Sequence, residues 1–140
     1  MRTRVTTNAN QVTKNLTANV VRAEKLIKQT VDKSTRLVMN TAKIGIQSPP
    51  KSGVSYTKGG VTHKSSAKGE YPATDTGFLV SNIAYEVRNF VGRVTSSAPY
   101  SKHLEYGTTN MSARPFMFPS LEKNRRKIVK MFKDASLISR

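Results

Sequence analysis

The chain has 140 residues and carries 24 Lys and Arg against 8 Asp and Glu, a formal net charge of +16. Such a surface attracts polyanions, a class that includes nucleic acid, anionic membranes and acidic proteins. The absence of cysteine excludes disulfides, thiolate zinc sites and a cysteine nucleophile. No apolar run exceeds three residues, so we expect no membrane-spanning segment, and residues 1–8 lack the apolar core of a signal peptide.

The first third of the chain has the pattern of one long helix. Apolar side chains recur at spacings of four and three residues, with lysines and arginines between them. A helix over residues 9–44 would be about 50 Å long, although serines and threonines leave open a break near 32–36. Gly45 and the Pro49-Pro50 pair are expected to end it. Because the first 55 residues contain no aromatic side chain, we expect residues 1–45 to form a helical arm that leans on a core built later.

Residues 46–70 form a basic, Gly- and Ser-rich segment, which we interpret as a flexible loop or a hairpin. Gly59-Gly60 lies between short stretches of alternating apolar and polar residues, a weak hairpin pattern. Lysines on such a segment give charge and reach without reading bases, and would contact a polyanion or a partner. A solvated loop that orders only in an assembly fits equally well. The candidate contact residues are Lys51, Lys58, Lys64 and Lys68.

Residues 71–140 are predicted to hold the core and a C-terminal helix. Side chains of the segment Thr74-Asp75-Thr76 can cap a short helix through residues 77–82. Alternation then predicts two antiparallel strands, over 83–87 and 90–95, joined by a short turn. Residues 98–106 make a turn or two of helix, stopped at Gly107.

The next segment is predicted to be a rigid corner. Pro115 and Pro119 stiffen an extended stretch in which Phe116 and Phe118 project to the same side. Arg114 is expected to form a salt bridge or to hydrogen-bond backbone carbonyls where the chain turns.

The last helix is predicted to start at Ser120, whose side chain would cap it. Its basic residues would cover the outer face, and its inward-facing residues would be Leu121, Ile128, Val129 and Phe132. The predicted fold is thus α+β in a single domain. A long N-terminal helix and a C-terminal helix pack on a small antiparallel sheet, with the basic segment as an insertion.

Catalytic patterns are lacking in the sequence. The two histidines are His63, in the basic segment, and His103, two residues from Glu105 and hence on another helix face. No zinc-protease, nucleophile-elbow or phosphate-loop motif occurs, and the acids are too scattered to nominate a pair. We therefore expect no enzymatic activity, no metal and no cofactor, with both histidines as surface residues.

Three motifs follow one another along residues 70–121. They are Glu70-Tyr71-Pro72-Ala73-Thr74-Asp75-Thr76-Gly77, Tyr100-x-x-x-Leu104-Glu105-Tyr106-Gly107-Thr108 and Met111-x-Ala113-Arg114-Pro115-Phe116. In this order, between two compatible helices, they resemble a family of tailed-bacteriophage proteins that join head to tail. These proteins are described as neck, tail-completion or minor tail proteins.

The resemblance implies an α+β subunit without enzymatic activity, in a homo-oligomeric, six-fold ring coaxial with the DNA channel. It implies a place at the head–tail interface of the virion, after assembly in the host cytoplasm. The partners would be the head connector and tail proteins, with no membrane. Motif residues that we assign to fold and assembly are Tyr71, Pro72, Asp75, Gly77, Tyr106, Gly107, Arg114, Pro115 and Phe116.

A nonspecific nucleic-acid-binding protein of nucleoid or ribosomal type is the alternative. Charge and size fit it equally well, whereas the three motifs do not. Residues 1–68 hold 13 basic and 2 acidic side chains, so most of the excess charge precedes the motifs. We therefore expect the charge to belong to a helix and a loop that a ring presents to its neighbours or, nonspecifically, to genomic DNA.

Overall fold

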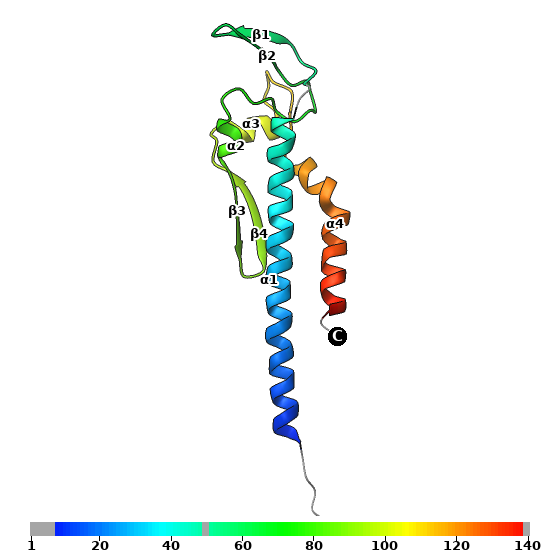
Figure 1. Ribbon diagram of the computed structural model, residues 1–140. Helices are drawn as coiled ribbons and strands as arrows, with labels where there is room; N and C mark the ends of the chain where they lie inside the picture. Colours follow the sequence, from blue (N-terminus) through cyan, green and yellow to red (C-terminus); the bar gives the residue numbers. More distant parts are fainter. Residues whose placement is uncertain (1–7, 49–50, 139–140) are drawn as a thin grey trace, which may run out of the picture.

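A long helix forms the spine of the molecule. The computed structural model describes residues 8–48 and 51–138. Its elements in chain order are α1 (Ala9–Gln47), β1 (Ser55–Lys58), β2 (Val61–Lys64), α2 (Phe78–Ser81), β3 (Ile83–Arg88), β4 (Val91–Ser96), α3 (Ser101–Tyr106) and α4 (Met117–Ile138). In Figure 1 the β3–β4 hairpin lies on one side of α1 and α4 on the other, while β1–β2 lies beyond the C-terminal end of α1. The predicted α+β fold is confirmed.

Helix α1 is continuous, so there is no break at residues 32–36. Hydroxyl groups of Thr30 and Thr35 donate to carbonyls one turn earlier, at 2.8 and 2.7 Å, and so remain compatible with the helix. The helix also passes through Gly45 instead of ending there. A Cβ atom at Gly45 would lie 2.4 Å from the ring of Tyr71, so this glycine allows a close approach. The predicted stop at Pro49-Pro50 lies outside the described residues.

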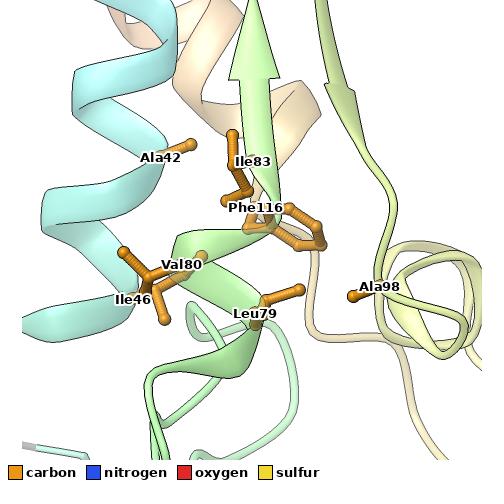
Figure 2. Close-up of a cluster of buried hydrophobic side chains, with 7 residues drawn as sticks. All are labelled: Ala42, Ile46, Leu79, Val80, Ile83, Ala98 and Phe116. Carbon is orange, nitrogen blue, oxygen red and sulfur yellow. The ribbon is translucent and has the colours of Figure 1, made fainter.

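The core is small and includes the C-terminal half of α1. Ala42 and Ile46 pack against buried side chains of α2, β3 and the segment before α3. Figure 2 shows the ring of Phe116 lying between Ile83 and Ala98. By contrast, residues 8–29 of the same helix include no buried residue.

Both antiparallel hairpins predicted from the sequence are present. β1 and β2 pair across a turn at Gly59 and Gly60, both with positive φ, so the segment 46–70 contains a hairpin. β3 and β4 pair from Ile83↔Ser96 to Arg88↔Val91. Their two-residue turn consists of Asn89 and Phe90, whose φ values of 48° and 63° match the twist of the strands.

The prediction for the start of the last helix is wrong. α4 begins at Met117, three residues before the predicted cap, and Ser120 lies inside it. Pro119 fits there because the first turn of a helix needs no partner for its backbone nitrogens. Since helical residues turn by 100° each, Phe116 and Phe118 do not share a side: Phe116 is 1% exposed and Phe118 65%.

Candidate assembly surfaces

The second and third motifs meet at the N-terminus of α4 through Glu105. Its Oε2 atom accepts hydrogen bonds from the backbone N–H groups of Phe116 and Met117, at 2.8 and 3.0 Å. Its Oε1 atom accepts one from Phe118, at 2.9 Å. These N–H groups have no partner within the helix, and a negative charge is favourable at this end of its dipole. Glu105 is therefore the cap of α4.

Gly107 gives the chain the sharp turn that brings the third motif back to α3. Its φ of 77° and ψ of 179° are open to glycine alone. A Cβ atom there would lie 2.8 Å from the carbonyl oxygen of Met111 and 2.9 Å from the nitrogen of Ala113. Beyond the turn, the N–H of Arg114 donates to the carbonyl of Leu104 at 2.7 Å, which closes the loop.

The first motif joins the same junction through Tyr71. Its ring lies against Gly45 of α1, and its hydroxyl oxygen lies 3.0 Å from that of Ser120 in α4. The neighbouring Pro72 is buried. The side chain of Tyr71 thus contacts both α1 and α4. Through Tyr71, Glu105 and Arg114 the three motifs meet at the start of α4, and we call this region the motif junction.

Asp75 and Gly77 connect the junction to the β1–β2 hairpin. Asp75 accepts a hydrogen bond from the ammonium group of Lys58 at 2.8 Å, which lowers the pKa of this carboxyl group. Its other oxygen lies 3.3 Å from Nδ1 of His63. Gly77, with φ of 76°, is the N-cap residue of α2, and its N–H donates to the Thr74 hydroxyl at 3.0 Å. Asp75 thus holds the hairpin and does not cap the helix.

Glu70 anchors the base of the same hairpin. The hydroxyl of Ser52 donates to its carboxylate, as do the N–H groups of Ala67, at 2.9 Å, and Ser52, at 3.1 Å. These bonds lower the pKa of Glu70 to about 2. Close by, the ammonium group of Lys51 donates to the carbonyl of Gly45 at 2.7 Å, and burial lowers the pKa of Lys51. The segment after α1 is thus fastened to the helix end.

The four lysines that we expected to contact a polyanion differ in their partners and exposure. Lys51 is bonded to the end of α1 and Lys58 to Asp75. Lys64, at the end of β2, and Lys68 are exposed. Two of the four thus have partners in the described chain, and polyanion contact stays a prediction for all four.

Three residues of the second and third motifs differ in exposure. Arg114 is half-buried, and its Nε atom has no hydrogen-bond partner within residues 8–48 and 51–138. The expected salt bridge or carbonyl contact of this side chain is not seen in that part of the chain. Pro115 is half-buried beside it, whereas Tyr106 is 77% exposed.

An open groove of about 660 Å³ lies along α1. Its floor is the middle of α1, β4 and the β3–β4 turn form one wall, α4 forms the other, and α3 closes one end. Three of the residues that we expected to face inward from α4 line this groove instead of a closed core: Leu121, Ile128 and Phe132. Val129, the fourth, is exposed. The apolar face of α4 was identified correctly, but its burial was not, because nothing in the described chain fills the groove.

A second apolar surface lies on the N-terminal half of α1. Residues 9–28, here called the α1 overhang, extend past the tip of the β3–β4 hairpin (Figure 1). The ammonium group of Lys28 lies 5.4 Å from the ring of Phe90 at that tip. Five of the overhang's six large apolar residues are exposed, and the sixth, Leu26, is half-buried; the exposed ones are Val12, Leu16, Val20, Val21 and Ile27.

The histidines form no catalytic cluster in the described chain. His63 is stacked on Tyr56, with ring centroids 5.6 Å apart, and His103 is exposed on α3. Within the described ranges, no three His, Asp or Glu side chains gather in a way that could hold a metal ion. Over the same ranges, no helix has the length and apolar character to cross a membrane.

Sequence reasoning missed Glu105 and Glu70. Glu105 accepts from N–H groups 11 to 13 residues away, and Glu70 from one 18 residues away as well as from Ala67, three residues away. Capping motifs in sequence are recognised at spacings of two or three residues at the start of a helix, so Glu105 had no local signal, and the Ala67–Glu70 spacing lies in a turn and not at a helix start. That both acids lie inside the quoted motifs was the one available indication.

No family model, curated protein or solved structure matches this chain. The evidence for function therefore comes from the residues themselves: a junction formed by the three motifs, and two apolar surfaces that residues 8–48 and 51–138 leave uncovered.

Proposed function

We propose that this chain is a structural subunit of a tailed-phage virion, which forms a ring joining the head connector to the tail around the DNA channel. It would act without catalysis or cofactor, at the neck of the virion, after assembly in the host cytoplasm. The sequence resemblance supports this proposal through the three motifs. The observation that carries it is the groove together with the overhang, because both are apolar and both lack a partner in the described chain.

Uncovered apolar surface of this extent is unusual for a monomer and typical of a subunit that its neighbours cover. The groove and the overhang are different surfaces, so a contact between them is heterologous. Heterologous contacts close into rings when the rotation between subunits divides a full turn. This is the symmetry that an adaptor around a DNA channel requires.

In this proposal the motif junction positions α4 relative to the rest of the subunit. Glu105 and Gly107 set the direction in which α4 leaves α3, and Tyr71 links α4 to α1. These contacts fix α4, one wall of the groove, relative to α3 and to the floor formed by α1. The motif residues would thus preserve the shape of the subunit, and the surfaces around them would make the contacts.

One observation favours the alternative, a nonspecific nucleic-acid-binding protein. The outer face of α4 is an exposed row of cations consisting of Lys123, Arg125, Arg126, Lys127, Lys130 and Lys133. Such a row binds phosphate backbones without reading sequence. In a ring, the same row would face neighbouring proteins or the DNA in the channel.

Negative-stain imaging and DNA gel shifts of the full chain, at 50 and 500 mM salt, separate the two functions. The adaptor is expected to form annular particles, and more of them at high salt, because screening weakens repulsion between subunits of charge +16. Its DNA binding is expected to be weak. A monomer or dimer that binds DNA tightly at 50 mM, and loses that binding at 500 mM, would contradict the adaptor and support the alternative.

A further inference from the structure

The groove is suited to an uncharged occupant. Among its lining residues only Lys102 and Glu105 are charged, and the carboxylate of Glu105 already accepts three backbone hydrogen bonds. The remaining lining is apolar or hydroxylic. In a chain of charge +16, this is the wrong lining for a polyanion and the right one for the apolar face of a protein segment.

The floor of the groove contains one unsatisfied polar atom. Ser34 is 6% exposed, and its hydroxyl oxygen has no hydrogen-bond partner within the described residues. The neighbouring Thr35 bonds the carbonyl of Val31, as buried helix hydroxyls commonly do. A buried polar atom without a partner is costly, and an occupant that lets the Ser34 side chain turn toward its own amide or hydroxyl group would remove that cost.

The overhang presents the same helix face as the groove floor. Along α1 the apolar stripe follows an 11-residue repeat, in which Leu16 and Ile27 occupy the position that Val38 occupies on the floor. A repeat of 11 residues keeps a stripe on one side of a nearly straight helix. From Asn15 to Val21 the overhang carries no charge.

An overhang cannot enter the groove of its own chain. The groove floor is α1 itself, and the overhang continues that helix without a break past the hairpin tip. Folding back would require the helix to reverse direction. The occupant that matches this groove in chemistry is therefore the overhang of a second copy.

The overhang is long enough to fill the groove along the α4 wall. The α4 wall runs from Phe118 to Phe132, about 21 Å at 1.5 Å per residue, and the overhang is about 30 Å long. A helix about 10 Å across that buries half of its circumference along 21 Å covers about 330 Å² on each partner. One overhang–groove contact then buries about 660 Å² over both copies, the size of a weak interface, and a chain that gives one overhang and receives another makes two such contacts, about 1,300 Å² in all.

We propose that residues 9–28 of one copy dock, apolar face inward, into the groove formed by α1, β4, α3 and α4 of a second copy. Leu16 lies at the centre of the docked face, and Asn15 or Asn19 supplies the hydrogen bond that Ser34 lacks. The closing of these contacts into a ring rests on the function proposed above. The docking itself does not depend on it.

Two variants on neighbouring turns of the overhang test the docking. Leu16 and Val21 are each 60% exposed, but Val21 lies about 140° around the helix from Leu16. Leu16→Asp is expected to raise the concentration for half-assembly at least tenfold in sedimentation velocity, because it places a carboxylate in the groove. Val21→Asp is expected to assemble like the unmodified chain, since its side chain remains in water.

The outcomes separate the docking from the ring. If the chain forms rings, and Leu16→Asp abolishes them while Val21→Asp leaves them intact, both proposals are supported. If Leu16→Asp does not affect the rings, the docking proposal is overturned and the ring proposal is retained. Dimers that Leu16→Asp dissociates support the docking and overturn the ring. A chain that remains monomeric at high concentration overturns the docking.

Cross-linking provides a direct readout of the contact, because the chain has no cysteine of its own. Chains with Leu16→Cys are mixed with chains with Leu121→Cys, a residue on the groove lining, and oxidised. Docking predicts mixed disulfide-linked pairs from Leu16→Cys and few from Val21→Cys. Equal yields from the two overhang positions would contradict a docked apolar face.

Discussion

One carboxylate determines how α4 leaves the motif junction. Glu105 satisfies three N–H groups at the start of the helix, so the helix can begin at Met117 without a local capping side chain. Because α4 is a wall of the groove, this cap also fixes where that wall stands. Glu105, which lies in one of the three sequence motifs, thus helps to position the groove that we propose for assembly.

Glu105→Ala is expected to lower the free energy of unfolding by about 1–3 kcal/mol, because it removes the acceptor for three backbone N–H groups. Urea unfolding followed by circular dichroism measures the change. Glu122→Ala is the control: among the described residues this exposed acid on the same helix pairs with Arg125 alone, so its loss is expected to cost less than about 0.5 kcal/mol. Equal effects of the two changes would contradict the cap.

Gly107→Ala is expected to cost about 3 kcal/mol or more, because the added Cβ atom meets the backbone at Met111 and Ala113. Gly59→Ala, in the β1–β2 turn, is the matched control. Its φ of 58° is also positive, but a Cβ atom there would have no neighbour within 4 Å, so we expect a cost of about 1 kcal/mol. Thermal unfolding of both variants distinguishes a steric requirement from a conformational preference alone.

Single residues were predicted well where the signal was local. Gly107 was correctly expected to stop a helix, since glycine after a short helical run is such a signal. Ser120 was wrongly predicted to be the N-cap of α4 because Pro119 before it was taken as the end of the extended segment. Proline is common in the first turn of a helix, and here both residues lie inside α4. The partner of Glu105 lies across a loop, and only the folded chain reveals it.

At the scale of elements, the β1–β2 hairpin is held by side chains from outside its strands. Glu70 receives bonds from Ser52 and Ala67 at its base, and Asp75 holds Lys58 near its turn. The strands themselves expose nearly all their residues. The hairpin therefore depends on these charges more than on burial.

This dependence predicts a pH effect. The folded pKa of Glu70, about 2, lies below its ordinary value of 4.5. Its contribution to stability is thus complete above pH 4.5 and is lost as the pH falls toward 2. Urea midpoints at pH 6 and pH 3 are expected to differ less for Glu70→Gln than for the unmodified chain. An equal pH response in both would show that other carboxyl groups account for it.

The elements themselves were largely predictable from the sequence. Apolar periodicity identified α1, and alternation around Asn89 identified β3 and β4. Periodicity does not reveal what covers a stripe: Leu16 and Val38 occupy equivalent positions, yet one is exposed and the other buried. For the same reason the residues of α4 were expected inside a core, while they line a groove. The missing information concerns a partner outside the chain.

At the scale of the whole molecule, the charge is arranged around the apolar surfaces and not within them. The basic row of α4 and the lysines of the hairpin lie outside the groove, whose lining has two charged residues. Repulsion between copies therefore acts at long range and weakens with salt, while the contact surfaces themselves remain neutral.

The overhang also has a dynamic consequence. In the described chain its backbone hydrogen bonds are largely exposed to water, and apart from the half-buried Leu26 and the contact of Lys28 with Phe90 little tertiary packing adds to them. In a separate subunit most of the overhang should therefore melt and re-form in a helix–coil equilibrium. We expect amide hydrogens of residues 12–28 to exchange orders of magnitude faster than those of residues 31–46. Mass spectrometry of exchange at low and high concentration measures this, and equal protection at low concentration would contradict it.

If a neighbour's groove orders the overhang, each contact must first repay the conformational entropy of about 20 residues. Dilute subunits would then remain apart, and only a high local concentration of subunits would favour assembly. The entropy cost of ordering the long overhang would thus delay assembly until subunits are brought together at high local concentration.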